Sequence, residues 1–216
     1  TIFLQNLKPQ FRTIFTDSFR ELKYVLTDDE YEEKNASDVT ISKFVSEIDK
    51  NSKVFQVFSF LFFSLLLIYF FKKKIKIETI TESNYHQLFQ FIIQFVSTEF
   101  EKHILKLKFN QFGALLFDKH FRNLSNYFTN VTQWTTRDKF ARLNQISTLL
   151  NFEKVNEIYD YWGNQSSLSW RLTSTEVKQI LALRIEFKSD DINRLKFKKK
   201  SKKQKEEEFS NMDFRQ

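Results

Sequence analysis

Apolar residues recur every three or four positions through most of the chain, which is the spacing of one face of an α-helix. In the first half this pattern predicts helices over 4–26, from about residue 40, and over 85–107, the last of them ending by Gly113. The stretch between the first two, 27–38 (TDDEYEEKNASD), is polar, acidic and without a period. We therefore expect that stretch to be a solvated loop.

The second half of the chain predicts shorter helices with clearer boundaries. Apolar stripes run over 117–131 and over 137–150. A third stripe follows in FEKVNEIYDYW, for which Asn151 is expected to be the N-cap and Gly163 the end. Short helices in succession with brief connections predict antiparallel neighbours.

The segment LTSTEV carries both halves of a helix-start signature. Thr173 and Glu176 can form a capping box, and Leu172 with Val177 can form a hydrophobic staple. The expected buried side of this helix is Val177, Ile180, Leu181 and Ile185. A last short turn is expected after Ser189.

The composition, taken together with these helices, predicts the fold class. The chain has two glycines, one proline and no cysteine, so it lacks the residues of tight hairpins, phosphate-binding loops, disulfides and thiolate metal sites. We predict an all-α protein of elongated antiparallel helical bundles with a small final helical bundle. The predicted division is one helical bundle from 1–56 and 78–163, the small final bundle over 164–195, and a tail over 196–216.

Residues 57–77, VFSFLFFSLLLIYFFKKKIKI, do not fit this pattern. The apolar run 54–71 would span about 27 Å as a helix, marginally enough to cross a membrane, so a membrane-anchored helical protein is the alternative interpretation. A crossing would place residues 1–53 on the far side and divide the bundle, and a core or interface helix is a further option. The codon bias of its residues favours a hydrophobic insertion of non-coding origin, such as an unspliced intron.

The net charge of +7 is concentrated in two short segments. Residues 196–216 carry seven Lys and one Arg against three Glu and one Asp, which is +4, and 57–77 carries four Lys, another +4. The remainder is therefore 7 − 4 − 4 = −1. A nearly neutral body argues against a nucleic-acid partner, and the basic and acidic tail is expected to be disordered.

Candidate chemistry is sparse. His86, His103 and His120 are interpreted as surface or half-buried structural residues, because no metal-binding motif accompanies them. The close carboxylate pairs, at 28–29, 32–33 and 190–191, fall in expected loops. We predict no catalytic residues, no metal site and no cofactor.

Two long segments, WTTRDKFARLNQISTLLNFEKVNEIYDYWG and WRLTSTEVKQILALRIEFKSDDINRL, resemble the carboxy-terminal region of the family of subunit four of the conserved oligomeric Golgi complex. The similarity extends back through TEFEKHILKLKFNQFG. It implies a non-catalytic helical rod in a tethering complex that captures retrograde transport vesicles, peripheral on the cytosolic face of the Golgi membrane. The partners it implies are the other subunits and SNARE fusion machinery.

The resemblance also implies one pair of site residues. Arg142, in KFARL, matches an arginine expected to bridge to a glutamate at the position of Glu176, which would fasten the final bundle to the one before it. The alternative is that Arg142 is solvated and Glu176 serves only its own capping box. The chain has Ser174 where the family tends to have proline at the first helical position.

Overall fold

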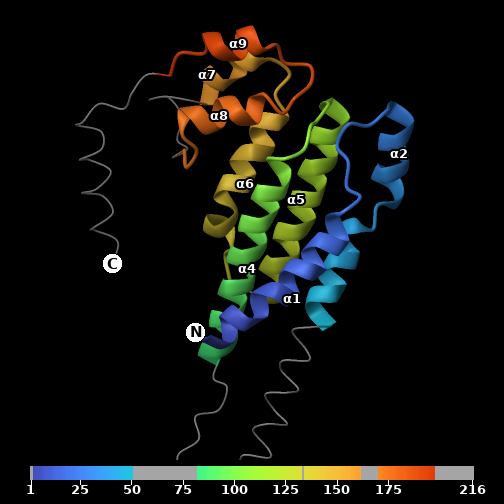
Figure 1. Cartoon of the computed structure of the whole chain (residues 1–216), viewed down its shortest axis with the longest axis vertical. Helices are drawn as coiled ribbons and strands as arrows, with labels where there is room; N and C mark the ends of the chain where they lie inside the picture. The colour runs from blue at the N-terminus through green and yellow to red at the C-terminus, as the bar shows by residue number, and fades with distance from the viewer. Residues whose placement is uncertain (1, 51–81, 133, 162–169, 198–216) are drawn as a thin grey trace, which may run out of the picture.

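Helices make up nearly all the regular structure in the computed structural model, which describes residues 2–50, 82–132, 134–161 and 170–197 (Figure 1). The long helices are α1 (Ile2–Phe19), α4 (Glu82–Ile104), α5 (Gln111–Thr132) and α6 (Arg137–Leu150). The short ones are α2 (Asp28–Ser37), the 3₁₀ turn η1 (Val155–Glu157), α7 (Ile158–Tyr161), α8 (Ser174–Leu181) and α9 (Ser189–Arg194). Residues 40–50 are also helical. The all-α prediction is confirmed.

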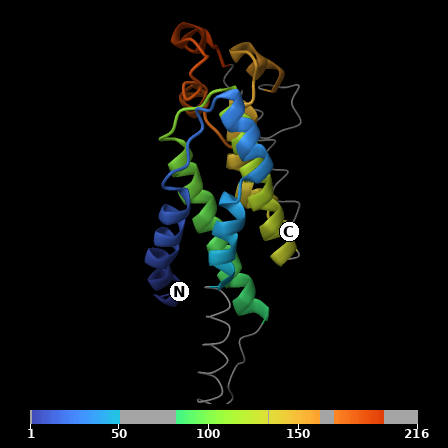
Figure 2. The same ribbon diagram turned by 90° about the vertical axis from the view of Figure 1, so that its right-hand side faces the viewer.

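The long helices give the molecule an elongated shape. α4, α5 and α6 run side by side along the long axis in alternating directions, and α1 lies against α4 (Figures 1 and 2). The short helices α7, α8 and α9 gather at one end, where α8 packs against α6. The opposite end carries both ends of the connection 51–81, which leaves residue 50 and returns at α4.

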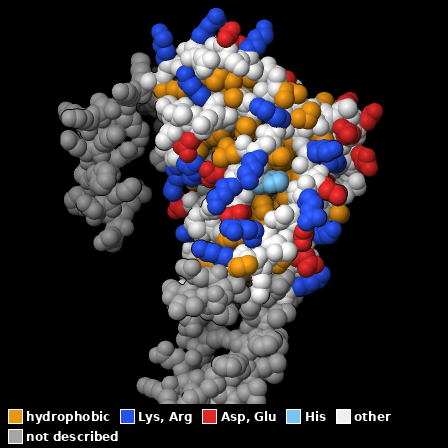
Figure 3. All heavy atoms as spheres, viewed as in Figure 1, with side chains coloured by type: hydrophobic (Ala, Val, Ile, Leu, Met, Phe, Trp, Pro, Cys, Tyr) orange, Lys and Arg blue, Asp and Glu red, His pale blue; other side chains and the backbone are white. Residues whose placement is uncertain are grey.

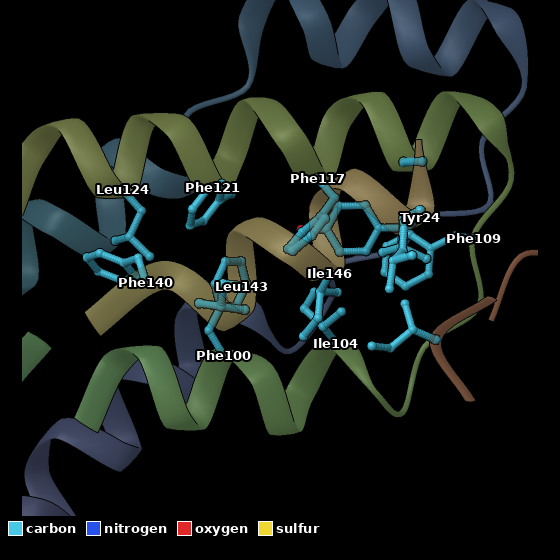
Figure 4. Packing of buried hydrophobic residues seen from close by; sticks show 14 of the residues in the cluster. Tyr24, Phe100, Ile104, Phe109, Phe117, Phe121, Leu124, Phe140, Leu143 and Ile146 are labelled. Carbon is cyan, nitrogen blue, oxygen red and sulfur yellow. The ribbon is translucent and has the colours of Figure 1, made fainter. Parts of the chain in front are cut away.

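A continuous aromatic and aliphatic core fills the space between α4, α5 and α6 (Figure 4). Phe100, Phe117 and Leu143 are among its fully buried members, one from each of these helices. The stripes read from the sequence supply most of it, since side chains three and four residues apart share one face of a helix. The helix over 40–50 adds Ile41, Phe44 and Ile48.

The prediction of a loop over 27–38 is wrong, because Asp28–Ser37 forms α2. Thr27 and Glu30 make a capping box, in which the Thr27 hydroxyl accepts from the Glu30 backbone N–H and the Glu30 carboxylate accepts from Thr27 N at 2.8 Å. Carboxylates in the first turn add to this by facing the positive end of the helix dipole. None of its residues is buried, so a search for apolar periodicity misses it, and Figure 3 shows acidic side chains gathered over it.

Gly113 does not end a helix, contrary to the sequence prediction. α4 stops at Ile104, and Gly113 lies in the first turn of α5. A Cβ atom there would overlap the backbone carbonyl of Tyr24, so this glycine serves the close approach of two chain segments. Asn110 secures the approach, since its side-chain oxygen accepts from Gly113 N at 2.9 Å and from Leu26 N at 3.2 Å.

Two further boundaries differ from the predictions. α1 ends at Phe19 and does not reach residue 26, because the chain turns there and Tyr24 continues in extended form. Asn151 is the C-cap of α6, where its side-chain amide donates to the carbonyls of Ser147 at 2.8 Å and Ala114 at 3.3 Å. The segment predicted as one helix from 152 begins later, as η1 and α7.

Three distant segments meet beside the end of α6 through isolated β-bridges that pair Tyr24 with Phe109 and Phe109 with Arg184. The backbone bonds Asn110 N to Tyr24 O, 3.1 Å, and Ile185 N to Phe109 O, 2.9 Å, hold them together. Arg184 forms the bridge and is buried, whereas Ile185 lies in the turn that follows α8 and is 56% exposed. The prediction that Ile185 belongs to the buried side of its helix is therefore wrong.

Candidate functional site

Arg142 is the centre of an ion-pair cluster between the long helices and the final ones. Its side chain projects from α6, where it is 35% exposed. Nε donates to both carboxylate oxygens of Glu101 on α4 at 3.1 Å, and Nη2 lies 2.7 Å from Glu101 Oε1. Nη2 also lies 2.7 Å from Glu176 Oε1 on α8, and Nη1 donates to the carbonyl of Arg171 at 2.8 Å. One guanidinium therefore joins α4, α6, α8 and the segment that leads into α8.

Glu176 divides its two oxygens between two tasks. Oε1 faces Arg142, whereas Oε2 accepts from the backbone N–H of Thr173 at 2.7 Å and from its hydroxyl at 2.8 Å. The capping box predicted from LTSTEV is thus present, with Leu172 and Val177 buried beside it. Arg142 and Glu176 are in contact, and the N-terminal cap of α8 is also formed. Glu176 can therefore bind Arg142 and serve in the capping box at the same time.

The proton affinities in the cluster follow from these contacts. Hydrogen bonding to Glu101, opposed by burial and assisted by Glu176, raises the pKa of the Arg142 guanidinium above its ordinary value. The hydrogen bond from Arg142 and the Thr173 backbone N–H lower the pKa of Glu176 from 4.5 to about 2. Both groups therefore keep their charges at neutral pH.

Glu101 was not recognised in the sequence as a partner of Arg142. It follows Phe100 on α4, and Arg142 precedes Leu143 on α6, so each charged residue flanks a buried stripe. Because α4 and α6 pack through these stripes, the flanking side chains come within reach of each other. A charged residue next to the buried stripe of its helix, as Glu101 is, can therefore be recognised in the sequence as a candidate partner for Arg142.

Arg184 makes a second connection between the final helices and α6, and no pattern in the sequence predicts it. Its side chain is 4% exposed, and Nη1 donates to the carbonyls of Leu150 and Phe152 where α6 ends. Nε donates to Glu186 at 3.0 Å, and the guanidinium lies over the Phe187 ring, 4.8 Å from its centroid. The buried charge is thus balanced by one carboxylate and two carbonyls.

The histidine prediction is wrong for His120, which is buried. Its ring nitrogens contact Tyr24 Oη at 2.9 Å and the Asp38 carboxylate, so it joins the segment before α2, the segment after α2, and α5. Burial raises the pKa of Asp38, but the hydrogen bonds from His120 and Thr40 outweigh it and lower that pKa overall. His103 is half-buried and His86 exposed, as expected.

The remaining predictions concern the carboxylate pairs, a metal site and three segments of the chain. The carboxylate pairs at 28–29, 32–33 and 190–191 lie on α2 and α9 rather than in loops, though all are exposed. Within the described ranges, no three His, Cys, Asp or Glu residues are placed to hold a metal ion. The insertion 57–77, the boundary between the main and final bundles at 163–164, and the tail beyond residue 197 lie outside the described residues.

None of the helices in the described part of the chain combines the length and the hydropathy that crossing a membrane requires. The alternative of a membrane anchor rested on residues 54–71, which are not among the described residues.

We expect Arg142→Leu to destabilise the fold by about 2 kcal/mol. Glu101 and Glu176 would then face each other without the cation that both contact, and the figure is reduced because the cluster is partly solvated. Arg142→Lys should cost less, although an ammonium cannot bind both carboxylates in the same geometry. Urea unfolding measures the loss, and limited proteolysis should show faster cleavage near α8 with little change in helix content.

A double-mutant cycle with Glu176→Gln is the control for this prediction. Because the folded-state pKa of Glu176 is depressed, the stabilisation by its charge is present above pH 4.5 and is lost as the pH falls toward 2. The coupling energy should shrink over that interval. An absence of coupling at neutral pH would show that the pair does not attach α8 to the rest of the bundle.

The sequence is similar to known proteins over most of its length. The family model described as "Conserved oligomeric Golgi complex subunit 4, C-terminal" matches residues 1–179. The chain is 38% identical over 191 residues to the conserved oligomeric Golgi complex subunit 4 of Homo sapiens, which covers 88% of this chain and 22% of that protein. It is 34% identical over 189 residues to the Arabidopsis thaliana protein of the same name, covering 87% and 23%. The chain thus spans less than a quarter of these relatives.

Proposed function

This chain belongs to the family of the carboxy-terminal region of subunit four of the conserved oligomeric Golgi complex, and on that premise we propose that it is a non-catalytic scaffold in a Golgi vesicle-tethering complex. Its task is to hold neighbouring subunits and SNARE fusion machinery during retrograde transport within the Golgi. It acts as a peripheral protein on the cytosolic face of the membrane. The family match over residues 1–179 carries the proposal.

The architecture supports a scaffold. A scaffold has to keep its binding surfaces at fixed relative positions, and one continuous core joins α4, α5 and α6 along the long axis. The final helices are attached to this rod at two separate places, by the Arg142 cluster and by Arg184. Surfaces on the final helices and on the rod are therefore presented together.

The proposal is tested in cells that lack the endogenous subunit. Full-length protein, either intact or with this region deleted, is expressed, and the other subunits are co-purified with it. We expect the deletion to reduce recovery of at least one subunit and to move Golgi-resident glycosylation enzymes out of their normal compartment. The charge-reversed protein Arg20→Glu, altered at an exposed position on the α1 side of the bundle, is the matched control.

Unchanged co-purification and unchanged enzyme distribution after the deletion would contradict the proposal. Loss of the whole protein to degradation is separated from loss of function by comparing the abundance of the intact and the deleted proteins in the cells.

A further inference from the structure

A groove of about 990 Å³ runs along the outside of the hairpin formed by α5 and α6. Small side chains, Ser125 on α5 and Ala141 on α6, keep its floor low between the two helices. Trp170 and Arg171, which precede α8, close one side, and Trp134 in the connection between α5 and α6 lies at another. A concave surface with walls of this kind admits a convex rod rather than a flat partner.

The wall at Arg171 is fixed by contacts on both sides. Its backbone N–H donates to the side chain of Gln145 at 2.9 Å, its guanidinium lies 2.9 Å from Asp138, and its carbonyl accepts from Arg142. Trp170 donates its indole N–H to the carbonyl of Tyr161 at 2.6 Å. The groove is therefore formed before any partner binds, which lowers the entropy cost of binding.

The lining has a clear chemical preference. Its charged residues are Arg122, Arg137, Arg171 and Asp138. Arg122 lies 2.6 Å from Asp118 and Arg171 lies 2.9 Å from Asp138, so the groove with these two carboxylates carries 3 − 2 = +1, and Arg137 supplies the excess positive charge. The partly exposed rings of Trp134, Tyr161 and Trp170 stand beside them. Arginine and aromatic side chains are the residues most enriched where protein interfaces derive their binding energy. Carboxylates and an apolar face on the partner would satisfy both kinds of group.

We propose that this groove binds an acidic amphipathic helix of a neighbouring subunit. The net charge of +1 and the exposed Arg137 favour an acidic segment, and the groove between two antiparallel helices has the form that accepts a third one. The wall on α5 extends from Phe121 to Asn130, a rise of about 14 Å, so about two and a half turns of the partner helix are held. This inference rests on the proposed function and adds the surface through which one subunit is held.

A photocrosslinking experiment with the full-length subunit and the purified remaining subunits tests the proposal. The photoreactive residue p-benzoylphenylalanine replaces Asn144, which lines the groove, or Glu32, which lies on the exposed surface of α2, as the control position. Crosslinked peptides are identified by mass spectrometry. We expect Asn144, and not Glu32, to crosslink to a segment that has net negative charge and a helical apolar period.

Charge reversal provides the second measurement. Arg122→Glu with Arg137→Glu should weaken binding to the crosslinked subunit about tenfold. Both side chains are exposed, so folding should be retained. The matched control, Arg20→Glu with Lys23→Glu, makes the same change of charge on the exposed side chains that follow α1 and should leave binding unchanged.

The possible outcomes separate the two proposals. If the intact subunit assembles with the others but Asn144 crosslinks to a neutral or basic segment, or to none, the groove proposal is overturned while the scaffold proposal stands. If groove reversal lowers flotation with vesicles of phosphatidylcholine and phosphatidylserine but leaves subunit binding unchanged, the groove binds lipid and the proposal is likewise overturned. If the intact subunit binds no other subunit, the scaffold proposal itself fails.

Discussion

Gly113→Ala should destabilise the protein by about 3 kcal/mol, although the same exchange inside an ordinary helix is favourable. The added methyl group would occupy the position of the Tyr24 carbonyl. That carbonyl cannot move away cheaply, because it accepts from Asn110 N at 3.1 Å and because the Tyr24 ring is buried against Phe109, 4.8 Å between centroids. Urea unfolding followed by far-UV circular dichroism measures the effect.

Asn123→Ala, at an exposed position further along α5, is the control for helix propensity and should be neutral or slightly stabilising. A Gly113→Ala protein as stable as this control would mean that the segment around Tyr24 gives way, and that its approach to α5 contributes little to the fold.

Arg184→Met should also cost about 3 kcal/mol, because it removes a buried donor from two carbonyls that then have no partner. Methionine fills a similar volume, so the loss reports the polar contacts more than a cavity. The final helices should become more accessible to proteases, since Arg184 joins them to the end of α6. Arg184→Lys should recover only part of the loss, as an ammonium cannot reach Glu186 and both carbonyls together.

Arg194→Met is the matched control. Arg194 is 80% exposed, and its ion pair with Asp191 is long, at 3.8 Å, and therefore weak. We expect it to cost less than about 0.5 kcal/mol. Equal losses for Arg184→Met and Arg194→Met would show that Arg184 does not attach the final helices.

Local signals in the sequence were reliable guides to this fold. The apolar stripes of α4, α5 and α6 lie in the core as predicted. The predicted capping box of Thr173 and Glu176 is present at the start of α8. Both depend on residues within one or two helical turns, so no knowledge of the rest of the chain is needed. The same local chemistry at Thr27 and Glu30 was overlooked because α2 has no apolar stripe.

Contacts between distant segments were harder to predict. Spacing along one helix shows which face is buried, but it leaves open which residue of another helix lies opposite. Glu101 could therefore not be assigned to Arg142, and a buried role for Arg184 was invisible, because its acceptors are backbone carbonyls that every residue possesses. Gly113 was misread for the same reason, since its neighbour Tyr24 is 89 positions away.

The position of the connection 51–81, with both ends at the same end of the bundle, determines how its length affects folding. Ile48 before it and Phe89 after it are both in the core, so folding brings these two positions together. The entropy cost of joining two fixed points by a flexible chain grows only with the logarithm of the chain length. Removing residues 57–77 would shorten the connection from 31 residues to 10, which changes that cost by about 1 kcal/mol. On this scale the closure cost of residues 57–77 is smaller than the loss that we expect from Arg184→Met alone.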